Sequence, residues 1–160
     1  MREPQAWTGG CQCGAVRFRV SKLGRPSICH CRMCQKAHGS VGGVYVVGFD
    51  FAVTRGALNH FRSSNKVRRG FCADCGTPLT FDMDAGGLDI AIAAFDRAAE
   101  IAPAIQYSPE ARLPWFNALP GLRVRTPKEE THVAAHYDGI VSYQHPDHET
   151  AAWPLPEPKP

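Results

Sequence analysis

Residues 72–76 of this chain read Cys72-Ala73-Asp74-Cys75-Gly76, two cysteines separated by two residues and followed directly by glycine. At this spacing both thiols can reach one ion, and the glycine permits the tight turn that the backbone makes after the second thiol. The pattern is typical of a zinc knuckle. It therefore indicates a small fold organised around bound metal.

The other five of the seven cysteines form two further tight clusters, Cys11 with Cys13 and then Cys29, Cys31 and Cys34. Seven is an odd number, and cysteines this close together make poor mutual disulfides. In a reducing compartment such clusters more often hold a soft metal ion, for which zinc is the default. We therefore interpret all three clusters as metal ligands.

Seven ligands divide naturally into four and three. A structural zinc ion takes four protein ligands, whereas a catalytic zinc ion keeps three and leaves one position open. The count predicts one closed and one open site but does not say which cysteines form each. A ribbon-like alternative would join Cys31 and Cys34 to Cys72 and Cys75 and leave the other three cysteines over.

Length and composition exclude several classes of protein. A chain of 160 residues suggests one domain with at most a small appendage, and 44% hydrophobic with 21% charged residues fits a globular chain. A net charge of +3 is small for a nucleic-acid binder. No run approaches the ~20 apolar residues of a membrane span, and no apolar signal core follows the N-terminus. We expect a cytoplasmic protein with neither a membrane nor a nucleic-acid partner.

Most of the chain is predicted to form short strands. Val16, Phe18 and Val20 alternate with Arg17 and Arg19, which predicts a strand with its apolar side chains toward a core and both arginines toward solvent. Other β-branched and aromatic runs predict further strands, the last of them an edge strand because it contains proline. These runs cover residues 41–47, 49–54, 79–81, 88–95 and 101–107. The fold class is therefore mainly β.

The C-terminal segment has a different pattern. Residues 126–129 read Thr-Pro-Lys-Glu, a capping-box pattern with proline at the first helical position. Apolar residues then recur at helical spacing, so we expect residues 126–143 to form a short amphipathic helix packed on the domain. The proline-rich end from Trp153 is expected to be mobile. This divides the chain into a zinc-binding domain, residues 1–125, and an appendage, residues 126–160.

Three segments carry a family resemblance. They are Gly9-Gly10-Cys11-Gln12-Cys13-Gly14-Ala15-Val16, Cys29-His30-Cys31-Arg32-Met33-Cys34-Gln35-Lys36-Ala37-His38-Gly39 and Phe71-Cys72-Ala73-Asp74-Cys75-Gly76-Thr77-Pro78-Leu79. In this order they strongly resemble the glutathione-dependent formaldehyde-activating enzyme family, which also includes centromere protein V. The likeness extends through Pro114-Trp115 and covers about residues 5 to 125.

The resemblance implies a fold and a ligand assignment. The fold is a β-tent of short antiparallel sheets joined around zinc. By the family's pattern a structural zinc ion is held by four cysteines, and a catalytic zinc ion is held by the remaining three. The four are Cys11, Cys13, Cys72 and Cys75, and the three are Cys29, Cys31 and Cys34.

The resemblance also implies a reaction. Founding members of the family join formaldehyde to glutathione and give S-hydroxymethylglutathione, the reverse of a carbon-sulfur lyase reaction. Three thiolates make a zinc site net negative, so it activates water weakly but still binds another soft sulfur as thiolate. We expect a lyase-like enzyme whose partners are glutathione or a related thiol and a small aldehyde.

Glutathione is anionic at both ends, so cationic side chains are expected to line its groove. The candidates are Arg32, Lys36, Arg68 and Arg69. The two arginines before the knuckle have an alternative role as a solvated strand face. His30 is expected to be a packed histidine rather than a ligand. His38 is expected to lie on a helix surface, with a role near the pocket as the less favoured alternative. No paired carboxylate or Ser-His arrangement suggests a general base.

A second class of function is a non-enzymatic module that uses zinc only for stability and binds a protein or nucleic acid. The resemblance to centromere protein V allows this reading. A binding module needs only the four-cysteine site, so the presence of Cys29, Cys31 and Cys34 favours an enzyme. A glycine-rich dinucleotide fingerprint is absent from the sequence, which argues against a dehydrogenase.

Overall fold

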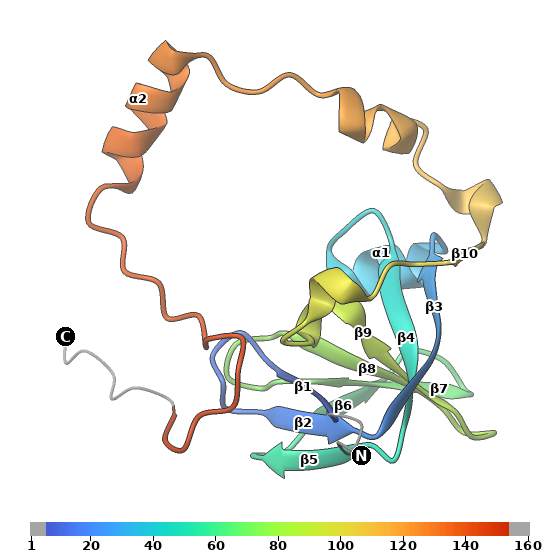
Figure 1. Cartoon of the computed structure of the whole chain (residues 1–160). Helices are drawn as coiled ribbons and strands as arrows, with labels where there is room; N and C mark the ends of the chain where they lie inside the picture. The colour runs from blue at the N-terminus through green and yellow to red at the C-terminus, as the bar shows by residue number, and fades with distance from the viewer. Residues whose placement is uncertain (1–5, 154–160) are drawn as a thin grey trace, which may run out of the picture.

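The computed structural model describes residues 6–153, and within them ten strands form two sheets (Figure 1). The smaller sheet has the order β1-β2-β5, and its strands are antiparallel. Their bounds are β1 Trp7–Gly10, β2 Arg17–Val20 and β5 Ala52–Arg55. The mainly β fold predicted from the sequence is confirmed.

The larger sheet has seven strands in the order β10-β3-β4-β9-β8-β7-β6. All neighbours are antiparallel except β10, which runs parallel to β3 at the sheet edge. The bounds are β3 Lys22–Cys29, β4 Gly43–Phe49, β6 Asn59–Arg62, β7 Val67–Phe71, β8 Pro78–Met83, β9 Leu88–Ala91 and β10 Ile105–Tyr107. A short helix, α1 (Arg32–His38), connects β3 to β4.

The core draws side chains from both sheets. Phe18 and Val20 of β2, Val46 of β4 and Ile90 of β9 are almost completely buried. The Phe18 ring meets the ring of Phe95 edge-on, with 5.2 Å between centroids. The predicted inward face of the β2 strand is therefore confirmed.

The strand predicted over residues 88–95 is shorter in the structure. It ends with β9 at Ala91, and Ile92–Ala94 form a turn of 3-10 helix. The physical reason is a change of sheet, because β9 pairs with β4 and β8, whereas Phe95 bridges to Gly9 of β1. Further 3-10 turns lie at Ala98–Glu100, Pro109–Ala111 and Phe116–Gly121.

The prediction that Arg17 faces solvent is wrong. Its side chain is 2% exposed, and its two terminal nitrogens donate to the Asp96 carboxylate at 2.8 and 2.6 Å. One of these nitrogens also donates to Glu149 at 2.8 Å. Strand alternation assumes a solvated second face, and Arg19 is exposed there as predicted, but Asp96 and Glu149 cover Arg17. A buried guanidinium needs such partners because an unpaired buried charge is costly.

The C-terminal helix, α2 (Pro127–Tyr137), starts where the sequence predicts. Glu129 N donates to Thr126 Oγ1 at 3.4 Å, and Thr126 N donates to Glu129 Oε2 at 2.8 Å, which completes the capping box. None of its residues is buried, and it stands clear of both sheets (Figure 1). The prediction that this segment packs on the domain is wrong. The physical reason is that Val133 and Tyr137 are the only sizeable apolar side chains of α2, which otherwise carries mainly lysine, glutamate and histidine.

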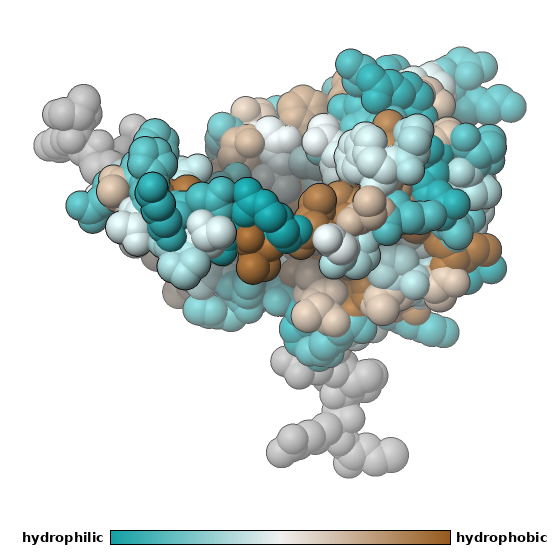
Figure 2. Space-filling view, turned by 90° about the horizontal axis from the view of Figure 1, so that it is seen from above, coloured by the Kyte–Doolittle hydropathy of each residue, from teal (hydrophilic) through white to brown (hydrophobic). Residues whose placement is uncertain are grey.

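Residues 113–144, called the arm here, form an arc that leaves the domain and returns to it (Figure 1). Large apolar side chains of the arm are exposed, and hydrophobic patches are visible from above among hydrophilic ones (Figure 2). The exposed apolar side chains of the arm include Trp115, Leu119, Leu122, Val124, Ile140, Val141 and Tyr143.

No helix within residues 6–153 is long and apolar enough to cross a membrane.

Residues 145–153, called the clasp here, dock onto the domain. His145 N donates to Gln12 O at 2.7 Å, and Arg55 donates to the Thr150 carbonyl. Trp153 donates its indole N–H to the Cys13 carbonyl and packs edge-on against the His145 ring. The prediction of a mobile end is therefore wrong at Trp153. The rest of that prediction concerns residues 154–160, which lie outside the described residues.

Candidate functional site

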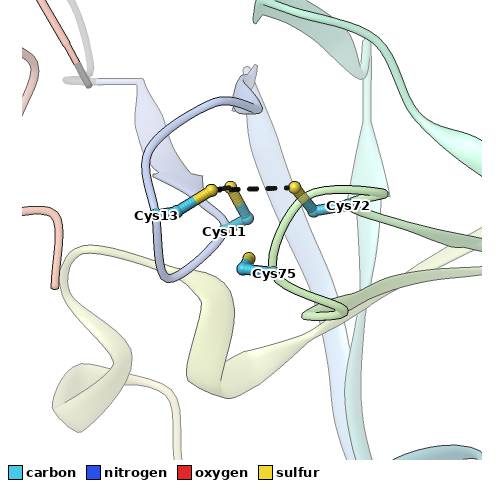
Figure 3. A group of neighbouring side chains, drawn as sticks. All are labelled: Cys11, Cys13, Cys72 and Cys75. Atoms are coloured by element: carbon cyan, nitrogen blue, oxygen red, sulfur yellow. Dashed lines mark hydrogen bonds between the residues drawn. The ribbon is translucent and has the colours of Figure 1, made fainter. Parts of the chain in front are cut away.

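Four cysteines meet where two turns face each other (Figure 3). Cys11 and Cys13 lie in the turn after β1, and Cys72 and Cys75 lie in the turn between β7 and β8. The four sulfur atoms all lie within 4.8 Å of one another, with 3.6 Å between Cys11 and Cys13 and 3.8 Å between Cys13 and Cys72. Two turns distant in sequence thus form one cluster of thiols.

Glycine shapes both turns. Gly14 and Gly76 each follow the second cysteine of their pair and have φ angles of 74° and 75°, the left-handed region that favours glycine. Their amides donate back to the carbonyls of the first cysteines, Gly14 N to Cys11 O at 3.1 Å and Gly76 N to Cys72 O at 2.9 Å. The tight turn predicted after Cys75 is confirmed, and a second turn of the same kind supports Cys13.

The geometry of this cluster fits a tetrahedral metal. A zinc ion bound by sulfur at about 2.3 Å places its ligand atoms about 3.8 Å apart, close to the separations here. All seven cysteines are free thiols, and Cys11 and Cys72 are buried. Four sulfurs around one point leave no ligand position open, so the cluster suits a structural ion.

The remaining three cysteines form a second cluster around the start of α1. Cys29 is the last residue of β3, Cys31 is the N-cap of α1 and accepts a hydrogen bond from Cys34 N at 3.5 Å, and Cys34 is buried in the first turn. Their sulfur atoms also lie within 4.8 Å of one another. Three convergent sulfurs could hold an ion with a fourth position open.

The thiols of each cluster differ in how readily they ionise. Burial raises the pKa of the Cys29 thiol to about 12 and that of Cys11 well above its ordinary value. At Cys31 and Cys75 burial acts in the same sense, but hydrogen bonds outweigh it and lower the pKa, to about 6 for Cys75. A bound metal ion supplies the positive charge that favours the thiolate form of the buried thiols. The chemistry of the donor set therefore agrees with its geometry. The cysteines are grouped as four and three, not in the ribbon-like arrangement.

The candidate cationic residues lie in different environments. Arg32 and Lys36 are exposed on α1, and Arg32 donates to Gln35 Oε1 at 3.1 Å. Arg68 is exposed on β7 and pairs with Asp82 at 2.5 Å. Arg69 points the other way and is only 4% exposed. The solvated face considered for both arginines therefore holds for Arg68 and is wrong for Arg69.

Arg69 connects the three-cysteine cluster to Tyr45 and His38, two residues that the sequence analysis did not group together. Its guanidinium donates to Cys34 Sγ at 3.5 Å and to Tyr45 Oη at 2.6 Å. The same hydroxyl lies 2.6 Å from His38 Nε2. The expectation that His38 lies on a helix surface is wrong. Tyr45 carried no signal because its role depends on strand order, which brings β4 and β7 into one sheet.

A pocket of about 300 Å³ adjoins this group, lined by His38 and Arg69 together with Phe61 and Phe71. His30 lies outside it, completely buried, with its ring edge-on to Phe116 at 4.8 Å between centroids. The prediction that His30 is a packed side chain is confirmed. The pocket combines apolar walls with one buried cation.

Two sheets, one cluster of four cysteines and one cluster of three define a mainly β protein whose cysteines could hold metal ions. Comparison with known families makes the class specific. Residues 6–109 match the family model described as glutathione-dependent formaldehyde-activating enzyme, and the chain belongs to this family.

Other comparisons add only the fold. A crystal structure of a Rhodobacter sphaeroides protein, solved by structural genomics, is similar with a TM-score of 0.51 and 20% identity. The similarity covers 62% of this chain and 98% of that one. A search of curated proteins found no match.

Proposed function

We infer that this protein is a zinc-dependent, carbon-sulfur lyase-like enzyme that joins a glutathione-type thiol to formaldehyde or a similarly small aldehyde. A bond forms between the thiol sulfur and the carbonyl carbon, the carbonyl π bond breaks, and the thiol proton ends on the carbonyl oxygen. The step balances without an oxidant or reductant. The observation that carries the proposal is the cluster of three convergent sulfurs, which would leave the fourth position of a tetrahedral ion without a protein ligand.

The two clusters would have separate roles. Cys11, Cys13, Cys72 and Cys75 would hold a structural zinc ion and fix the two turns. Cys29, Cys31 and Cys34 would hold a second zinc ion, whose open position favours the thiolate form of an incoming thiol. The protein's contribution is to hold three sulfurs on one side of that position and to orient the thiol for attack.

Cationic side chains near α1 would select an anionic thiol. Arg32 and Lys36 project from the exposed side of the helix that carries Cys34, where they can attract the carboxylates of glutathione. Arg68 lies further out on β7 and already pairs with Asp82. Seven free thiols fit a reducing compartment such as the cytoplasm. We place the catalytic domain in residues 1–125, with residues 126–160 as an appendage.

The alternative is a zinc-stabilised binding module for a protein or nucleic-acid partner. The exposed apolar side chains along the arm favour this reading, because large apolar surfaces often mark partner sites. The second cysteine cluster has no function in such a module.

Calorimetric titration with glutathione and with S-methylglutathione tests the proposal. Glutathione should bind and the methylated form should bind much more weakly, because a thioether is a poor ligand and cannot become a thiolate. The variant Cys31→Ser is the control and should lose the difference. Equal binding of both compounds would place glutathione away from the cysteines, and binding of neither would favour the module.

Turnover is a separate measurement. With glutathione present, the purified protein should consume formaldehyde faster than the spontaneous reaction does. Consumption at the spontaneous rate, despite tight thiol binding, would mean that another carbonyl compound is the substrate.

A further inference from the structure

Arg69 is a buried arginine whose guanidinium contacts the sulfur of Cys34, and its burial needs a physical reason. Arg69 lies on β7, its guanidinium stacks over the Phe81 ring at 4.8 Å, and it is 4% exposed. It forms no carboxylate ion pair within residues 6–153, and its acceptors are Cys34 Sγ and Tyr45 Oη. A buried cation without a carboxylate is costly unless another negative group faces it.

The hydrogen bond from Arg69 to Tyr45 has a definite direction. Arginine carries only donors, so the Tyr45 hydroxyl accepts from Arg69. The same hydroxyl is hydrogen-bonded to His38 Nε2, and the tautomer of His38 decides which of the two donates. Burial, together with the charge of Arg69, lowers the pKa of His38 to about 4, so the imidazole is neutral at neutral pH. His38 thus fixes Tyr45, and Tyr45 fixes the guanidinium against Cys34.

Arg69 faces a cysteine cluster that would carry a net negative charge when it holds a metal ion. Three thiolates and one divalent cation leave one net negative charge, and a fourth thiolate from a substrate raises this to two. Gathering that charge in a partly buried site is unfavourable without a counter-charge. Arg69 places a permanent positive charge 3.5 Å from one of the sulfurs.

We propose that Arg69, held by Tyr45 and His38, is a positioning residue that enables the three-cysteine site to accept a fourth thiolate by neutralising one of its charges. This rests on the proposed function, since it concerns the thiol that the site would bind. Arg69 contacts Cys34 rather than the substrate's reacting atoms. It differs in this from the exposed cations of α1, which would recognise carboxylates.

Cobalt-substituted protein provides a readout that does not depend on turnover, because sulfur-to-cobalt charge-transfer absorption increases with each bound thiolate. The probe is 2-mercaptoethanol, which has no carboxylate and so reports on the sulfur alone. Wild-type protein should show saturable growth of the absorption. Arg69→Met should retain both metals and bind the thiol on the order of tenfold or more weakly, because a charge-assisted hydrogen bond is lost.

Three further variants complete the test. Arg69→Lys keeps the charge and should recover part of the affinity. Tyr45→Phe keeps the ring and frees the guanidinium, so it should weaken binding several-fold. Arg62→Met is the matched control, since Arg62 is an exposed arginine of β6 paired with Asp84 in the turn after β8, and it should bind like wild type.

The outcomes separate the two proposals. Equal affinity of Arg69→Met and wild type would overturn the role of Arg69 and leave the proposed function standing. Absence of added absorption in wild type would overturn the proposed function itself. If Arg69→Met does not fold, Tyr45→Phe decides, and wild-type affinity in that variant would overturn the inference.

Discussion

At the scale of single residues, two arginines show how the environment decides what a charge does. Arg17 and Arg69 are both buried, and both lie on strands. Arg17 is satisfied by two carboxylates and holds the clasp to β2, whereas Arg69 faces a sulfur and a phenol. The contacts of Arg17 stabilise the fold, and we assign those of Arg69 to the three-cysteine site.

Asp96→Asn should destabilise the protein by about 3–5 kcal/mol, because it leaves Arg17 in the interior with a weaker partner. Chemical denaturation of the variant and wild type measures this free energy of unfolding. Glu149→Gln is the comparison, since Glu149 is half exposed, and it should cost less. Equal and small losses in both variants would contradict the structural role of the buried pair.

The same pair predicts a pH dependence. Burial alone would raise the pKa of Asp96, but hydrogen bonds from Arg17 and Thr8 outweigh it and lower the pKa below its ordinary value. A carboxyl with a depressed folded pKa contributes stability above its unfolded pKa of about 4 and loses it as the pH falls through the folded value. The free energy of unfolding should therefore fall less at acid pH in Asp96→Asn than in wild type. Chemical denaturation at several pH values measures this difference.

The arginines also show what single-strand patterns cannot predict. Alternation placed Phe18 and Val20 correctly, because the inward face of a strand is a local property. Alternation failed for Arg17, and the solvated face considered for Arg69 is also wrong, because the burial of both arginines depends on a second layer. That layer comes from segments distant in sequence, the clasp for one and α1 with β4 for the other.

At the scale of elements, the start of α2 depends on interactions within one turn, whereas the position of α2 and of the clasp depends on contacts between distant segments. The capping box was predictable, since Thr126 and Glu129 act on each other within one turn. The position of α2 was not, because its apolar stripe is too small to dictate packing. An isolated helix of 11 residues is marginal in water, so capping should matter for it more than usual.

Thr126→Ala should therefore reduce helix content without changing global unfolding. Loss of an N-cap costs about 1 kcal/mol of helix stability. Circular dichroism should show a smaller helical signal, while the main thermal transition should stay in place. A clear fall in the melting temperature would show that α2 packs against something.

Removal of residues 145–160, in contrast, should lower the melting temperature of the whole protein. It removes Glu149 from Arg17 and the hydrogen bonds of His145, Thr150 and Trp153 to the first sheet and its turn. With about 1 kcal/mol for each hydrogen bond, the melting temperature should fall by roughly 5 °C or more. Removal of residues 154–160 alone is the control and should have little effect. Similar melting of both truncations would contradict a docked clasp.

At the scale of the whole molecule, the seven cysteines gather into one cluster of four and one cluster of three. The sequence predicted the division by counting ligands, but spacing alone left the partners of each cysteine open. The resemblance to the family supplied an assignment, and the structure brings together the same groups. They meet because the β1 turn and the β7–β8 turn face each other, which follows from sheet order rather than from any one motif.

The central claim is that these clusters are two metal sites with different roles, and zinc stoichiometry in cysteine variants tests it most directly. Cys72→Ser should leave most of the protein unfolded or insoluble, because structural zinc contributes on the order of 10–16 kcal/mol to folding. Cys31→Ser should fold, melt close to wild type and contain one zinc equivalent where wild type contains two. If the two variants lose zinc and stability alike, or if Cys31→Ser keeps both ions, the division into a structural and a thiol-binding site is wrong.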